Sequence, residues 1–209
     1  MFFTQEMLNN NSYIRILHAV PNAPALDVYA NGTPIARNLS YRGFTEYMTL
    51  AAGTYNIEIY AAGRRDTPIL RTSITLPGRS IFTIAAAGRS PNISLLPIAE
   101  PRAMMPPGMV MIRFSHLSPN TPGVDIALPD GTILFRDVRF GETTQYIPVV
   151  PSTYRLQIRT TGTNRVILDV PNINLAANRY YTVYAIGLQG GQPPLQVLIP
   201  LDGQSYINP

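Results

Sequence analysis

Residues 15–28 read RILHAVPNAPALDV, and residues 113–126 read RFSHLSPNTPGVDI. An Arg, a His, two Pro and an Asp recur at matching positions, 98 residues apart. Farther along, residues 53–59 read GTYNIEI and residues 152–158 read STYRLQI, 99 residues apart. Self-similarity at a fixed spacing is the sequence sign of a repeated structural unit. The chain therefore predicts two tandem copies of one domain.

The repeat also sets the expected domain boundaries. Each copy spans about 90 residues, a size that folds alone. Three prolines between the copies predict a short, fairly stiff linker. The expected layout is an N-terminal arm at 1–12, a first repeat at 13–99, a linker at 100–109, a second repeat at 110–201 and a C-terminal tail at 202–209.

Short alternating runs between turn residues determine the fold class. In residues 54–60, Tyr55, Ile57 and Ile59 fall on one face of an extended chain. Asn31-Gly32 between two such runs is a strong hairpin signal. Strands of the first copy are expected at 13–18, 25–30, 34–39, 44–50, 54–60, 68–76, 80–87 and 93–97. The prediction is an all-β protein of two tandem immunoglobulin-like β-sandwiches.

The composition excludes several classes of function. The chain has no Cys, and all 16 of its basic residues are Arg, so thiol and Schiff-base chemistry are both excluded. These Arg residues are scattered rather than clustered, so we expect no nucleic-acid partner. No segment is long and apolar enough to span a membrane. Only 13% of residues are charged, which favours self-association through uncharged faces.

The repeated motif resembles the bacterial family called domain of unknown function 4397. The resemblance covers nearly all of residues 13–201. It implies an immunoglobulin-like fold and a loose association with bacterial surfaces, but no agreed activity and no ligand. The positions that carry it are Arg15, His18, Pro21, Pro24, Asp27 and Val28, and then Arg113, His116, Pro119, Pro122, Asp125 and Ile126.

The two histidines, His18 and His116, admit two interpretations. Each could be a metal ligand or a catalytic base paired with Asp27 or Asp125, respectively. Alternatively, imidazole and carboxylate tie the Pro-rich crossover to the next strand through hydrogen bonds. One His and one Asp in each copy are too few for a zinc site, and their duplication favours the structural interpretation.

No residue pattern in the chain indicates catalysis, so we expect no enzyme, no cofactor and no metal. The candidate interaction residues are aromatic. An apolar tip on the N-terminal arm includes Phe2 and Phe3, which could dock on a neighbouring subunit. One late strand carries Tyr180, Tyr181 and Tyr184, and alternation there is expected to expose at least one ring.

Two hypotheses of function follow. The first is a non-enzymatic structural protein of a bacterial surface or spore-surface layer or fibre, which assembles with itself through strand edges and the arm. The alternative is a monomeric module that binds carbohydrate or protein. The N-terminus lacks the pattern of a secretory signal, so the expected location is extracellular or spore-surface without a classical signal peptide.

Overall fold

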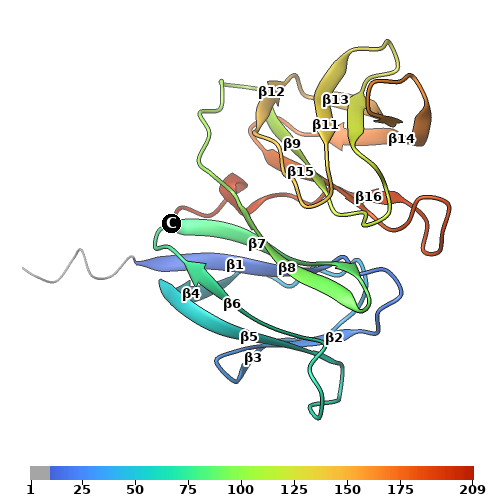
Figure 1. Ribbon diagram of the computed structural model, residues 1–209. Helices are drawn as coiled ribbons and strands as arrows, with labels where there is room; N and C mark the ends of the chain where they lie inside the picture. Colours follow the sequence, from blue (N-terminus) through green and yellow to red (C-terminus); the bar gives the residue numbers. More distant parts are fainter. Residues whose placement is uncertain (1–9) are drawn as a thin grey trace, which may run out of the picture. The chain divides into compact units, whose positions relative to one another are not determined.

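The computed structural model describes residues 10–209 and divides the chain into two compact units. Unit 1 runs to Pro101 and also includes Tyr206–Pro209, whereas unit 2 is Arg102–Ser205. Both units are built from β-strands (Figure 1). Phe2 and Phe3 of the predicted arm lie outside the described residues.

Unit 1 consists of two four-stranded sheets. The first sheet has the order β4-β1-β7-β8, in which β1 and β7 run parallel and the other pairs antiparallel. Its strands are β4 (Met48–Ala51), β1 (Asn11–His18), β7 (Ser80–Arg89) and β8 (Asn92–Ala99). The second sheet has the order β3-β2-β5-β6 and is antiparallel throughout. Its strands are β3 (Thr33–Leu39), β2 (Leu26–Ala30), β5 (Gly53–Ala61) and β6 (Leu70–Leu76).

Unit 2 repeats this topology strand for strand. The first sheet has the order β12-β9-β15-β16, again with one parallel pair, between β9 and β15. Its strands are β12 (Ile147–Val149), β9 (Val110–His116), β15 (Tyr180–Ile186) and β16 (Gln196–Leu198). The second sheet consists of β11 (Ile133–Val138), β10 (Val124–Ala127), β13 (Ser152–Thr160) and β14 (Val166–Leu175).

Alternating side chains from both sheets fill the core of each sandwich. In unit 1, Ile14 and Ile16 of one sheet meet Ile57 and Ile59 of the other. The core of unit 2 combines corresponding positions, and Tyr55 and Tyr154 pack against their cores as alternation predicts. The prediction of two tandem β-sandwiches is therefore confirmed.

The strand expected at 44–50 is shorter than predicted, because β4 covers only Met48–Ala51. Ahead of it, the Thr45 backbone N–H donates to the carbonyl of Ile16, but the Ile16 N–H donates to the Thr45 hydroxyl. A side chain thus replaces the carbonyl that a regular ladder would use, and only an isolated bridge between Leu17 and Phe44 remains. Unit 2 does the same with Thr144.

The hairpin turn predicted at Asn31-Gly32 joins β2 to β3. Both residues have positive φ angles, 48° and 79°. Two consecutive residues with positive φ are what a tight hairpin of this kind requires, and Asn and Gly tolerate that conformation best. The turn brings Asn31 beside the neighbouring strand β5, where its side-chain Oδ1 accepts a hydrogen bond from the N–H of Asn56.

Candidate functional site

The histidines of the repeated motif are fully buried, and backbone groups satisfy both ring nitrogens. Nδ1 of His18 accepts from the N–H of Val20 at 3.3 Å, and Nε2 faces the carbonyl of Pro24 at 3.0 Å. This pattern requires a neutral imidazole with its proton on Nε2. Burial lowers the pKa of His18, opposed by the hydrogen bond to Pro24. The second copy repeats the arrangement with His116, Ser118 and Pro122.

Each aspartate of the motif accepts hydrogen bonds from two backbone N–H groups, one in the adjacent edge strand and one in the loop that follows the other neighbouring strand. Asp27 Oδ1 accepts from Asn38 at 2.7 Å, and Oδ2 accepts from Gly63 at 3.0 Å. These two hydrogen bonds lower the pKa of Asp27. The carboxylate thereby fastens strand β2 to the chain on both sides. The second copy uses Asp125, Asp137 and Gly162 in the same way.

The remaining motif prolines, Pro21 and Pro119, lie in the same two loops that the histidines brace. In both copies, the imidazole and the carboxylate therefore form hydrogen bonds with backbone groups of their own unit. This geometry corresponds to the structural interpretation of His18, Asp27, His116 and Asp125.

The motif arginine of unit 1 belongs to a buried polar cluster. Arg15 Nε donates to the Thr83 hydroxyl at 2.8 Å, which in turn donates to Glu100 Oε1 at 2.9 Å. Tyr47 donates its phenolic proton to the same oxygen at 2.5 Å. The guanidinium also stacks on the rings of Phe44 and Tyr47, at 4.8 and 4.7 Å. The buried Glu100 carboxylate thus accepts hydrogen bonds from both Thr83 and Tyr47 beside the guanidinium of Arg15.

Unit 2 builds an equivalent cluster around Arg113. Its Nε donates to the Thr182 hydroxyl at 2.8 Å, and that hydroxyl donates to Asp202 Oδ2 at 2.6 Å. Tyr146 also donates to this carboxylate oxygen, at 2.8 Å, and its ring lies 4.5 Å from the guanidinium carbon. Asp202 is fully buried, although it falls in the segment predicted from sequence to be a C-terminal tail.

Neither Glu100 nor Asp202 was recognised from sequence, since both fall outside the matched repeat. A signal was present: a buried Arg requires an acid, and each of these is the acid that follows the last strand of its copy. Because Glu100 lies beyond the last matched strand of the first copy, it was assigned to the linker. Farther into that segment, Ala103 and Met105 pack against the cluster of Met111, Tyr146 and Tyr180 within unit 2, while Met104 is exposed.

The tyrosines of β15 do not form the exposed surface that alternation predicted. Tyr184 is fully buried and Tyr180 is buried, while Tyr181 is half-buried against the core of unit 2. Tyr180 packs edge-on against Tyr146 at 5.4 Å and donates its hydroxyl proton to the Ala103 carbonyl. The linker segment thus covers a ring that an isolated strand would expose.

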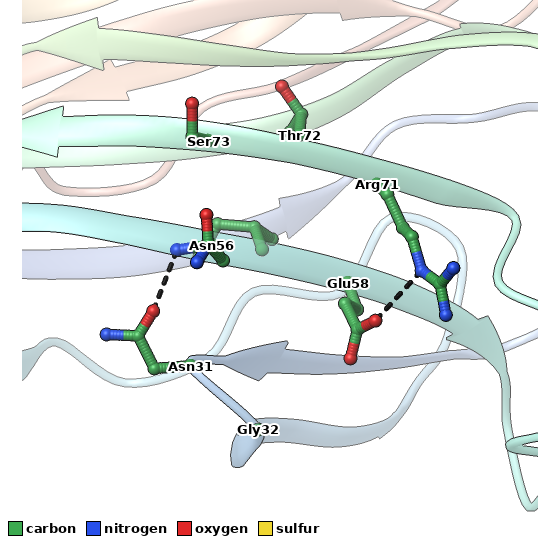
Figure 2. Close-up of a pocket in the computed structure, with 8 residues that line it drawn as sticks. Asn31, Gly32, Asn56, Glu58, Arg71, Thr72 and Ser73 are labelled. Atoms are coloured by element: carbon green, nitrogen blue, oxygen red, sulfur yellow. Dashed lines mark hydrogen bonds and ion pairs between the residues drawn. The ribbon is translucent and has the colours of Figure 1, made fainter.

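A groove of about 790 Å³ lies on unit 1, along β5 and β6 and beside the β2–β3 turn (Figure 2). No local sequence pattern marks this groove, because its residues come from three separate stretches of chain. Its polar lining consists of Asn31, Asn56, Glu58, Arg71, Thr72 and Ser73.

The strand register places Asn56, Ser73, Glu58 and Arg71 on one sheet face, whereas Thr72 pairs with the core residue Ile57 on the other. Asn56 pairs with Ser73 across β5 and β6, and its N–H donates to Asn31 Oδ1 at 2.9 Å. Two residues along, Glu58 pairs with Arg71, whose Nε donates to Glu58 Oε1 at 2.9 Å (Figure 2). Residues two apart in a strand point to the same side, so two adjacent polar rows form the floor of the groove.

The charges of the groove compensate each other. Its one carboxylate and its one guanidinium form an ion pair. The hydrogen bond with Tyr60, then the hydrogen bond with Glu58 and its negative charge, raise the pKa of Arg71. The other polar side chains are uncharged amides and hydroxyls, which both donate and accept hydrogen bonds. The groove is therefore suited to a neutral ligand with many hydroxyl groups.

Within residues 10–209, no three His, Asp or Glu side chains gather closely enough to hold a metal ion together. No helix in that range has the length and apolar character needed to cross a membrane.

Topology and buried clusters define a protein of two tandem, homologous β-sandwiches. The chain belongs to the family described as Domain of unknown function (DUF4397), which it matches over residues 12–127 and 118–205. The resemblance inferred from the repeated motif is thereby confirmed. No curated protein matches the chain.

Among solved structures, one similar chain is described as "Alpha-glucan binding by a streptococcal virulence factor". It is 12% identical, the match covers 94% of this chain and 99% of that one, and the TM-score is 0.26. At this level of similarity, glucan binding remains a statement about the streptococcal protein alone.

Proposed function

We propose that this protein is a non-enzymatic binding module that holds a neutral glycan in the β5–β6 groove of unit 1. The single observation that carries the proposal is the lining of that groove. Uncharged donors and acceptors surround a compensated ion pair in a depression on one sheet face. Small-ligand sites are concave and orient their ligand through a few convergent polar groups.

The ligand class follows from the chemistry of the lining. A sugar hydroxyl donates one hydrogen bond and accepts others, as the amides of Asn31 and Asn56 and the hydroxyl of Ser73 also do. An anionic ligand would compete with Glu58 for Arg71, and a cationic one would compete with Arg71 for Glu58. A neutral ligand leaves this ion pair intact. The proposal assigns the protein to an extracellular or spore surface, where such polymers occur.

The state of the titratable groups supports a role without catalysis. A general base must reach a substrate proton, but His18 and His116 are buried and their ring nitrogens already face backbone partners. Asp27 and Asp125 each use both carboxylate oxygens on backbone N–H groups. Neither a cofactor nor a metal is part of the proposal.

Affinity electrophoresis through gels containing soluble starch, xyloglucan or a β-1,3-glucan tests this function. We expect at least one polysaccharide to retard the wild-type protein and Asn56→Ala to remove most of the retardation. Arg155→Ala is the matched control, because Arg155 holds the corresponding position of β13 in unit 2. Equal retardation of both variants, or no retardation of the wild type, would contradict the proposal.

Self-assembly through a strand edge is a second candidate function, and β6 is the observation that favours it. Sheet-edge strands invite pairing with another chain unless proline, a bulge or a charge blocks them. The long edge strands β3, β8 and β14 contain Pro34, Pro97 and Pro171, and β14 is also irregular in register. Edge strand β6 contains no proline and pairs with β5 in unbroken register.

Negative-stain electron microscopy at low and high salt tests this second function. Salt-resistant fibres or sheets are expected if copies join through β6. Thr72→Lys, which places a charge on the core-facing side of this edge, should abolish them, whereas Thr72→Ser should not. A chain lacking residues 1–9 measures the contribution of the predicted arm. Single particles under all conditions would exclude assembly.

A further inference from the structure

Two tyrosines lie on the same outward sheet face as the groove. Tyr29 of β2 pairs directly with Glu58 of β5, so Tyr29, Glu58 and Arg71 form one row across three strands. Tyr60 of β5 pairs with Asp27 in the next row. The polar floor of the groove therefore continues into an aromatic pair, with the two rings edge to face at 5.7 Å.

These outward-facing rings are nevertheless covered. Tyr29 is 4% exposed and Tyr60 is 3% exposed. The guanidinium carbon of Arg65 lies 4.3 Å from the centroid of Tyr29, and that of Arg37 lies at 5.8 Å. Both arginines are themselves exposed. An aromatic surface is thus present on the sheet, but beneath arginine side chains rather than beneath the core of the fold.

Arg65 connects this cover to the groove. It comes from the β5–β6 hairpin, and its Nη2 donates to the carbonyl of Gly32 at 3.3 Å. Gly32 itself lines the groove. Arg65 therefore extends over the ring of Tyr29 and ends at the rim of the proposed binding site. A long hydrogen bond and a stacking contact at an exposed site are both weak, so a ligand can replace them.

We propose that Tyr29 is a stacking platform for a sugar ring of the bound glycan and that Arg65 is its displaceable cover. This inference rests on the proposed function and refines it to polymers of pyranose rings with an apolar face. Polar contacts in the groove bind hydroxyls of one sugar unit. The next unit along the chain displaces Arg65 and stacks on Tyr29, a contact for which tyrosine supplies both an apolar ring and a polar end.

Unit 2 lacks both tyrosines at the corresponding positions. Ala127 stands where unit 1 has Tyr29, and Arg159 stands where it has Tyr60. Arg159 instead donates to Gln157 Oε1 and to the carbonyl of Leu128. The platform is therefore specific to unit 1, the unit that carries the groove.

Three variants test the platform in the same gels. Arg65→Ala uncovers Tyr29 and should bind roughly two- to fivefold more tightly, because the exposed cation–π contact no longer competes with the ligand. Tyr29→Leu keeps an apolar side chain but removes the ring, and should bind roughly two- to tenfold more weakly. Arg64→Ala is the control from the same hairpin, because Arg64 pairs with Asp66. It should bind like the wild type.

Nitration of Tyr29 by tetranitromethane, located by peptide mass mapping, measures the cover independently of binding. We expect nitration to be several-fold faster in Arg65→Ala, with protection by the polysaccharide that binds. If Asn56→Ala loses binding while Arg65→Ala and Tyr29→Leu bind like the wild type, the platform is wrong and the groove remains. If no polysaccharide retards either the wild type or Arg65→Ala, both the function and the platform are wrong.

Discussion

On the outer face of the second sheet, unit 1 places Tyr29 opposite Glu58, whereas unit 2 places Ala127 opposite Gln157. The interiors show the opposite relation. A buried arginine, a threonine, a tyrosine and an acid make the same hydrogen bonds in both units. The units have thus kept one buried arrangement while their outer faces have diverged.

This comparison separates residues that build the fold from residues that can serve a ligand. The duplicated His, Asp and Arg side chains are buried and use their hydrogen-bonding groups within their own unit. The polar groove residues are exposed or half-buried, and unit 2 has Arg155 and Gln157 where unit 1 has Asn56 and Glu58. The surfaces in which the two copies differ are therefore the candidates for ligand binding.

Loss of the buried acid should be the largest effect and should be similar in both units. Glu100→Ala and Asp202→Ala each take a carboxylate from a buried guanidinium, which costs about 3–5 kcal/mol of unfolding free energy. Urea denaturation followed by tyrosine fluorescence measures the loss, and Asp66→Ala, in an exposed pair, should leave the midpoint unchanged. A large loss in one unit only would break the equivalence of the clusters.

Replacing either buried histidine should lower the free energy of unfolding by a smaller amount, and this contribution should depend on pH. His18→Gln or His116→Gln removes the partner of buried backbone groups and should cost roughly 1–3 kcal/mol. Burial holds the pKa of both imidazoles below the usual value of 6.5 in the folded state. The unfolded chain therefore takes up protons first as the pH falls, so their contribution is present above pH 6.5 and is lost below it.

Urea midpoints measured between pH 7.5 and pH 5 test this sign. The wild-type midpoint should fall as the medium becomes more acidic, and it should fall less steeply in either single variant. The double variant should be nearly flat over this interval. A wild-type midpoint that rises on acidification would show that the imidazoles are charged in the folded protein.

Sequence reasoning predicted the fold because the fold depends on local patterns. Alternation at Tyr55, Ile57 and Ile59 and the Asn31-Gly32 turn are each legible within a few residues. The groove depends instead on register: Glu58 faces Arg71 and Tyr29 only because three strands align in one particular way. No local pattern specifies that alignment.

Two errors have related causes. Tyr180 was named among the tyrosines of which at least one should be exposed. Alternation within a strand carries no information about a distant segment, and here the segment at Ala103 covers the Tyr180 ring. Glu100 and Asp202 were placed in a linker and a tail because they follow the last matched strands. Their repeat relation is hidden by extra residues between β15 and the end of unit 2.

Replacing the hairpin glycine of either unit should have a smaller effect on stability. Gly32 and Gly131 both have positive φ angles, 79° and 95°, and a Cβ at either position would meet open space. Replacement by Ala therefore costs backbone strain alone, about 1–2 kcal/mol in each case. Only Gly32→Ala should also weaken polysaccharide binding, since it disturbs the rim beside Asn31. Affinity electrophoresis of both variants, with equal losses of stability, checks this asymmetry.

The smallest expected effect concerns Tyr41, whose counterpart in unit 2 is Phe140. Tyr41 lies edge-on to His18 at 5.9 Å, and its buried hydroxyl has no hydrogen-bond partner among the described residues. Tyr41→Phe removes that hydroxyl and should increase the free energy of unfolding at pH 7, by less than about 1 kcal/mol.

Burial raises the pKa of Tyr41 to about 12, so the unfolded chain loses this proton first as the pH rises above 10. Wild-type stability should therefore decline above pH 10 more steeply than that of Tyr41→Phe, as urea midpoints at pH 8 and pH 11 can show. A marked loss of stability in Tyr41→Phe at pH 7 would mean that the hydroxyl contributes to unit 1 in a way that Phe140 cannot in unit 2.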